Sequence, residues 1–158
     1  MEISFSGKVV LVAGGTGGLG HAVSLAFLDE DAKVVVTYRK EAELAELKKA
    51  AGSRAAALEG AVVDVTDEGG VKRWIDGVVS RHGRVDALVN TVGGYAGGVK
   101  LWEMETKVFD AMLTLNLCSG YALARGVLPV MLKQRRGSIV NVAAKAAVDH
   151  GEIGRAHV

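Results

Sequence analysis

A glycine-rich turn between a strand-like run and a helical pattern constrains this chain more than any other feature. The turn belongs to the stretch VVLVAGGTGGLG at residues 9–20. The four apolar residues that open it, Val9–Val12, are typical of a strand buried on both faces of a parallel sheet. After Gly20 the apolar residues recur at helical spacing. This order predicts a phosphate-binding site, because the first N–H groups of such a helix point toward a bound anion. The alternative is a glycine-rich loop that binds nothing.

Strand-like and helical segments alternate along the whole chain. The helical patterns include residues 41–51 with Gly52 as a stop, a segment that Thr66 is expected to cap, and the long segment 106–134. Pro129 is expected to kink or end that last helix. The alternation predicts an α/β fold, a three-layer, doubly wound parallel sheet of the Rossmann type with about five strands. The predicted strands are residues 9–12, 33–37, 61–65, 86–91 and 138–143.

The composition bounds the kind of molecule and its partners. The length of 158 residues favours one domain, residues 1–158, with an irregular tail at 149–158. The net charge of +1 lacks the basic surplus of a nucleic-acid-binding protein, and no run of about 18 apolar residues predicts a membrane span. The single Cys118 and the lack of a secretory signal pattern favour a reducing compartment, the cytoplasm. The histidines have no acidic or cysteine partners at metal-ligand spacing, so we expect no metal site.

Polar and charged residues follow the predicted strands, where a doubly wound sheet binds its ligands. Asp64, Asn90 and Asn141 each lie near the end of a strand. Arg39 follows the second strand and Lys40 comes next, so this turn carries two cations and no acid. An acid here would bind the ribose hydroxyls of NAD, whereas an arginine can neutralise the 2′-phosphate of NADP. The sequence therefore predicts NADP over NAD, with a solvated basic turn as the alternative.

In their order along the chain, these motifs resemble those of the short-chain dehydrogenase/reductase family. The resemblance extends from about Gly7 to about Ala147 and covers almost the whole chain. No single motif is decisive, but their order and spacing together are specific. The matching segments are AGGTGGLG with Ala13 in place of the family's threonine, Asp64-Val65, Asn90-Thr91-Val92-Gly93, Asn116 with Gly120, Leu128-Pro129-Val130-Met131 and Gly137-Ser138-Ile139-Val140-Asn141.

The resemblance implies a Rossmann fold that binds a nicotinamide dinucleotide and acts on carbonyl or alcohol groups. Family members hold the dinucleotide on the glycine turn and on residues that follow the next three strands. The family's helix asparagine, matched here by Asn116, supports a water and the catalytic lysine. The cofactor-binding residues expected for this chain are Gly14, Thr16, Gly17, Gly18, Leu19, Gly20, Arg39, Asp64, Val65, Asn90, Val92 and Gly93.

The catalytic end of the sequence departs from the family pattern. The family has a serine after the fifth strand, a tyrosine further on and a lysine shortly beyond it. Here Ala143 and Ala144 occupy the serine positions, His157 lies near the tyrosine position, and the sequence stops at Val158 before a lysine. We therefore expect the cofactor half of an NADP(H)-dependent oxidoreductase, without the last strands of the family fold and inactive as it stands. The alternative is a non-catalytic nucleotide-binding or interaction module.

The long helical segment and the fifth predicted strand both favour self-association. The strand at 138–143 is expected to form an exposed edge of the sheet, and such an edge recruits a partner. Residues 106–134 carry apolar side chains beyond the stripe that one sheet face requires. We therefore expect a homodimer or higher homo-oligomer. The alternative is a monomer in which residues 149–158 fold back over the edge.

Overall fold

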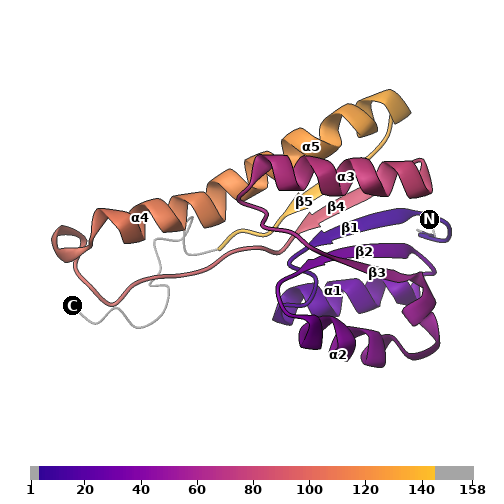
Figure 1. Ribbon diagram of the computed structural model, residues 1–158, viewed down its shortest axis with the longest axis horizontal. Helices are drawn as coiled ribbons and strands as arrows, with labels where there is room; N and C mark the ends of the chain where they lie inside the picture. The colour runs from indigo at the N-terminus through magenta and orange to yellow at the C-terminus, as the bar shows by residue number, and fades with distance from the viewer. Residues whose placement is uncertain (1–3, 145–158) are drawn as a thin grey trace.

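The computed structural model describes residues 4–144, and a single parallel sheet organises them (Figure 1). Neighbouring strands are hydrogen-bonded in the order β3-β2-β1-β4-β5, and every pair is parallel. The doubly wound Rossmann-type fold predicted from the sequence is confirmed. Strand order reverses between β1 and β4, and sheets of this kind bind ligands at such a point. The strands are β1 (Val9–Ala13), β2 (Lys33–Tyr38), β3 (Leu58–Val62), β4 (Ala87–Asn90) and β5 (Ser138–Asn141).

Helices cover both faces of the sheet, as Figure 1 shows. One face carries α1 (Gly18–Asp29) and α2 (Glu41–Ala51), and the other carries α3 (Glu68–His82) and α5 (Ser119–Gln134). Because side chains alternate along a strand, Val10 and Val12 pack in the core beneath α1 and α2. Val9 and Leu11 pack in the core beneath α3 and α5. All of β1 is therefore buried, which explains its unbroken apolar run.

The third strand begins earlier than the sequence predicted. β3 pairs with β2 from Leu58 to Val62, so the expected strand at 61–65 is wrong by three residues at each end. β2 fixes this register, because it ends at Tyr38, which is the partner of Val62. The interval after α2 is filled by a short 3₁₀ helix, η1 (Gly52–Ala57). The apolar residues beyond Val62 belong to a turn, and their composition resembled that of a strand.

The long helical segment is continuous but changes its geometry once. It consists of α4 (Thr106–Leu113), the π-turn η3 (Thr114–Cys118) and α5. α5 runs through Pro129 to Gln134, so of the two outcomes expected for this proline, a kink or an end, the end is wrong. Packing on the sheet holds the helix together there despite the hydrogen bond that proline lacks. The inward residues of α5 are Ala122, Leu123, Val127 and Met131.

By length and composition, the helix Thr106–Gln134 could cross a membrane. The core helix of a folded domain meets the same two criteria, and α5 is such a helix. α4 differs, because it projects away from the sheet and buries none of its residues within the part of the chain that the structure describes (Figure 1). The apolar side chains of this segment therefore pack in the core along α5 and are left largely exposed along α4.

β5 forms one edge of the sheet described by residues 4–144, as the sequence predicted. Within the described part of the chain it pairs with β4 alone, and it ends at Asn141, two residues before the predicted end at residue 143. The strand ends there because its last partner, Asn90, is also the last residue of β4. Val140 and Val142 are 51% and 48% exposed, so the edge is apolar and open.

Candidate functional site

The glycine turn after β1 is built by close backbone contacts. Gly14 has a φ of +74°, in the left-handed region that favours glycine. Its N–H donates to Thr37 Oγ1 at 2.8 Å, and its carbonyl oxygen accepts from the Gly17 N–H at 3.0 Å. A Cβ on Gly20 would lie 2.1 Å from the carbonyl oxygen of Gly14. The first turn of α1 therefore presses against the end of β1 as only glycines allow.

The same turn leaves one side of the backbone open. A Cβ on Gly18 would meet nothing within 4 Å, and Gly17 is exposed. Leu19, which follows, is 51% exposed. The backbone at the start of α1 is therefore accessible to a ligand, in the way a pyrophosphate site requires.

The first helical turn of α1 differs from those of α2 and α3. Among residues 4–144 no side chain caps α1, and its first turn carries no acid. α2 carries Glu41 and Glu43 in its first turn, and Asp67 caps α3 by accepting from the Gly69 N–H at 2.9 Å. The N–H groups and partial positive charge at the start of α1 are thus left for an anion. The cradle fits the phosphates of a dinucleotide.

Charged side chains crowd the turn between β2 and α2. Glu41 accepts a hydrogen bond from Tyr38 Oη at 2.5 Å, and this bond raises the pKa of Tyr38 above its ordinary value of 10.0. Glu43 accepts from Thr16 Oγ1 at 3.0 Å, and Lys40 Nζ lies 3.8 Å from its other oxygen. Arg39 is exposed and makes no ion pair within residues 4–144. The predicted cation after β2 is therefore in place and open to solvent.

The turn after β3 is held by Asp64. Its Oδ1 accepts from the N–H and the hydroxyl of Thr66, at 2.9 and 2.7 Å. These two hydrogen bonds hold the pKa of Asp64 below its ordinary value of 3.8. The expectation that Thr66 caps α3 is wrong, because its hydroxyl is engaged with Asp64 and Asp67 is the cap. Val65, the apolar residue of the predicted pair, is buried in the core beneath α3 and α5.

The ends of β1, β4 and β5 are joined by polar side chains. Asn90 is 5% exposed; its Oδ1 accepts from the Val92 N–H at 3.1 Å, and its Nδ2 donates to Asn141 Oδ1 at 3.3 Å. Thr91 Oγ1 donates to the carbonyl oxygen of Ala13 at 2.8 Å. Asn90 thus holds the backbone of its own turn through the Val92 N–H and links it to Asn141. Thr91 was missed, although a hydroxyl directly after a buried strand is a recurrent turn signal.

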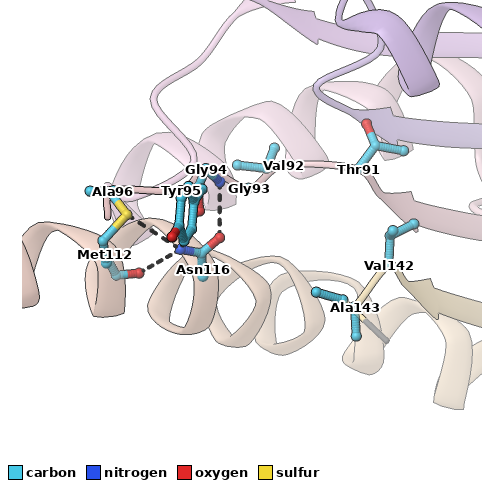
Figure 2. A pocket seen from close by; sticks show the side chains of 11 residues that line it. Thr91, Val92, Gly93, Gly94, Tyr95, Ala96, Met112, Asn116, Val142 and Ala143 are labelled. Atoms are coloured by element: carbon cyan, nitrogen blue, oxygen red, sulfur yellow. Dashed lines mark hydrogen bonds between the residues drawn. The ribbon is translucent and has the colours of Figure 1, made fainter. Parts of the chain in front are cut away.

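A pocket of about 660 Å³ lies beyond the ends of β4 and β5 (Figure 2). It lies between the loop after β4, the π-turn η3 and the segment after β5. The polar side chains that line it are Thr91, Tyr95 and Asn116, and its remaining lining is mostly glycine, alanine and other apolar residues. Val92 and Gly93, two predicted cofactor-binding residues, are part of this lining. The glycine turn and Arg39 are not.

Asn116 connects the π-turn to the loop after β4, as Figure 2 shows. Its Oδ1 accepts from the Gly94 N–H at 2.9 Å, and its Nδ2 donates to the carbonyl oxygens of Gly94 and Met112 at 3.0 and 2.9 Å. Because Asn116 is a polar residue on an otherwise apolar helical stripe of the sequence, the sequence predicts a buried partner for it, and this prediction is wrong. Both Asn116 and Gly94 are exposed, because α4 leaves the sheet and nothing among residues 4–144 covers this contact.

Alanines line the pocket on the side opposite Asn116. Ala143 and Ala144 follow β5 and belong to the lining, so the structure places the two expected serine positions at the pocket. Neither residue offers a hydroxyl. His157 and the expected tail at 149–158 lie outside the described residues. Within residues 4–144, no three histidine, cysteine or acidic side chains gather where they could hold a metal ion.

The chain is similar to known proteins along nearly its whole length. A family model described as short chain dehydrogenase matches residues 8–156. Among curated proteins, 3-oxoacyl-(acyl-carrier-protein) reductase FabG of Thermotoga maritima is 34% identical over 142 residues, covering 90% of this chain and 57% of that protein. L-fucose dehydrogenase of Rattus norvegicus is 36% identical over 145 residues, covering 89% of this chain and 50% of that protein. The chain thus spans about half the length of these relatives.

Solved structures agree with this similarity. The structure of ElxO with NADP bound matches with a TM-score of 0.85 and 32% identity, covering 89% of this chain and 57% of that one. The structure of NAD⁺-bound xylitol dehydrogenase matches with a TM-score of 0.88 and 28% identity, covering 94% of this chain and 57% of that one. The family model, the motifs and the fold converge. This chain belongs to the short-chain dehydrogenase/reductase family.

Proposed function

We propose that this chain binds NADP(H) and forms the dinucleotide-binding part of an oxidoreductase that acts on carbonyl or alcohol groups. The observation that carries the proposal is the open, uncapped start of α1 next to the turn that holds Arg39. The pyrophosphate would lie on the glycine turn, and Arg39 would face the 2′-phosphate. The bound cofactor supplies the hydride. The residues proposed to hold it are Gly14, Thr16, Gly17, Gly18, Leu19, Gly20, Arg39, Asp64, Val65, Asn90, Val92 and Gly93.

The pocket supports the place that we propose for the reacting end of the dinucleotide. It adjoins Val92 and Gly93, so a substrate carbonyl there would lie beside the dinucleotide. Reduction of a carbonyl also requires a group that polarises the oxygen and a proton donor. Ala143 and Ala144 supply neither. We therefore propose that the chain binds the cofactor without ordinary turnover, and that Asn116 only positions the loop at Gly94.

Titration calorimetry tests the cofactor preference. We expect NADPH to bind more tightly than NADH, and Arg39→Asp to reverse that order, because the substitution replaces an attractive charge with a repulsive one. Lys133→Asp is the matched control, since it makes the same charge change at an exposed residue of α5. Equal affinities of the unmodified protein for the two nucleotides would contradict the assignment.

The second candidate function is that of a non-catalytic nucleotide-binding or interaction module. The exposed apolar side chains favour the interaction role. Exposed apolar side chains recur along α4, η3 and α5. Contiguous apolar surface of this kind marks an interface. The exposed residues are Phe109, Leu113, Leu117, Tyr121, Leu128 and Leu132.

We further propose that two copies of the chain bury this surface against each other in a two-fold homodimer. We also propose that each chain is a single domain and that the protein is found in the reducing cytoplasm. Gel filtration with light scattering should report a dimer at micromolar concentration. Leu117→Glu should shift it to a monomer, because Leu117 is 65% exposed and a charge there would be buried by the partner. Glu46→Lys, at an exposed position of α2, should leave the mass unchanged. A monomer in the unmodified protein would end this proposal.

A further inference from the structure

We infer that Glu43 is a specificity-determining residue of the dinucleotide site, which weakens the preference for a 2′-phosphate. The inference rests on the proposed function, because it concerns the adenosine end of the same site. It starts from a contact between two parts of the sequence that are 27 residues apart, the glycine turn and the first turn of α2. Arg39 and Lys40 favour an anion at this place, and Glu43 opposes it.

The Glu43 carboxylate uses both of its oxygens. Oε2 accepts from Thr16 Oγ1 at 3.0 Å, and Oε1 lies 3.8 Å from Lys40 Nζ. The side chain of Glu43 is 38% exposed and that of Lys40 is 78% exposed, so the carboxylate is the more enclosed partner. Thr16 belongs to the glycine turn that would hold the pyrophosphate. Glu43 thus fixes a negative charge at the border of that turn.

The acid next to it has a different role. Glu41 also lies in the first turn of α2, but it accepts from Tyr38 Oη at 2.5 Å. Glu43 is therefore the acid of this turn that reaches the glycine loop. The two cations also differ in how far they are neutralised. Lys40 forms an ion pair with Glu43, whereas Arg39 makes no ion pair within residues 4–144. A 2′-phosphate held by Arg39 would meet the unneutralised part of the Glu43 charge.

The expected size follows from Coulomb's law at a wet surface. Two unit charges several ångströms apart in a solvent-exposed site repel enough to change an equilibrium on the order of fivefold, and salt reduces the effect. Removing the charge while keeping the hydrogen-bond acceptor should therefore favour the 2′-phosphate by about fivefold. The pyrophosphate and adenine contacts should be unaffected, because the Glu43→Gln side chain still accepts from Thr16.

Calorimetry with two adenosine fragments separates the charge effect from cofactor turnover. The probes are adenosine 2′,5′-bisphosphate, which carries the 2′-phosphate, and 5′-AMP, which lacks it. Glu43→Gln should tighten binding of the bisphosphate about fivefold and leave 5′-AMP within about twofold. The gain should shrink in high salt. Glu46→Gln is the matched control, because it makes the same change one turn further along α2, and it should alter neither affinity.

A second variant distinguishes charge from loop geometry. Thr16→Ala removes the hydrogen bond but keeps the charge, so it should not tighten binding of the bisphosphate. If Glu43→Gln changes both affinities by the same factor, Glu43 only positions the turn and the inference is wrong. The inference is also wrong if the unmodified protein binds both probes and Glu43→Gln changes neither affinity. If the unmodified protein binds neither probe, the proposed function itself fails.

Discussion

The centre of the sheet and its β5 edge differ in how they are held. Every residue of β1 is buried, whereas β5 has no fully buried residue and Val140 is 51% exposed. The helices next to the two candidate binding regions differ in the same way, since α1 beside the glycine turn buries Leu28, whereas α4 beside the pocket buries nothing within residues 4–144. The glycine turn therefore rests on a closed core. The pocket at Asn116 rests on exposed segments joined by a few hydrogen bonds, so its shape depends much less on packing.

The largest expected effect concerns chemistry at the pocket side. With alanine at 143 and 144, we expect carbonyl reduction with NADPH to be slower than in family members that carry the serine by about 10²- to 10³-fold, the usual cost of losing one donor that polarises the reacting oxygen. A nicotinamide absorbance assay over a panel of ketones and alcohols measures it, with calorimetric binding of NADPH as the control for an intact site. Turnover of about 1 per second or more would contradict the expectation.

The second-largest expected effect is on the free energy of unfolding, which should fall more for a substitution in β1 than for one in β5. Leu11→Ala removes a fully buried side chain of β1 and should lower the free energy of unfolding by about 2–5 kcal/mol. Val140→Ala, on the exposed edge strand, should change it by no more than about 0.5 kcal/mol. Urea denaturation of both variants gives the comparison. Equal losses would show that β5 is as well packed as β1 in the protein in solution, and the contrast would then be wrong.

The smallest effect is electrostatic. Asp64 has its pKa lowered by the Thr66 hydroxyl and N–H, so the stability that these bonds contribute is present above the ordinary value of 3.8 and is lost as the pH falls through the lower folded value. The contribution is small, because Asp64 is exposed to solvent. Thr66→Val should raise the pKa of Asp64, as measured by NMR titration of the carboxyl carbon. An unchanged titration midpoint would show that the hydroxyl does not hold the carboxylate.

Residues with a strong local pattern were predicted correctly from the sequence. The apolar run of β1 and the helix that stops at Gly52 fall where expected. The third strand did not, because its start depends on the register against β2, and residues 61–65 have the apolar composition of a strand. Register is a property of pairs of segments, which a single stretch of sequence does not contain.

The candidate site shows the same division. The glycine turn was predicted, because glycines such as Gly14 and Gly20 meet local backbone requirements there. The contact between Thr16 and Glu43 was not predicted, because it joins residues that the fold brings together from two different turns. Asn116 was expected to have a buried partner because it is a polar residue on an otherwise apolar stripe of the sequence. That stripe faces the sheet only in α5, and Asn116 lies before it, in η3.

The π-turn η3 has a consequence for the angular phase of the long helix. A π-turn accommodates one residue more than an α-helix over the same length, and one residue corresponds to about 100° of rotation around the helix axis. Thr114–Cys118 therefore sets which side of α4 faces the loop after β4, independently of how α5 sits on the sheet. A variant with one residue deleted between these positions would keep α5 in place and turn α4 by that angle. The Asn116 amide would then no longer face Gly94, and the pocket would be lined by a different side of α4.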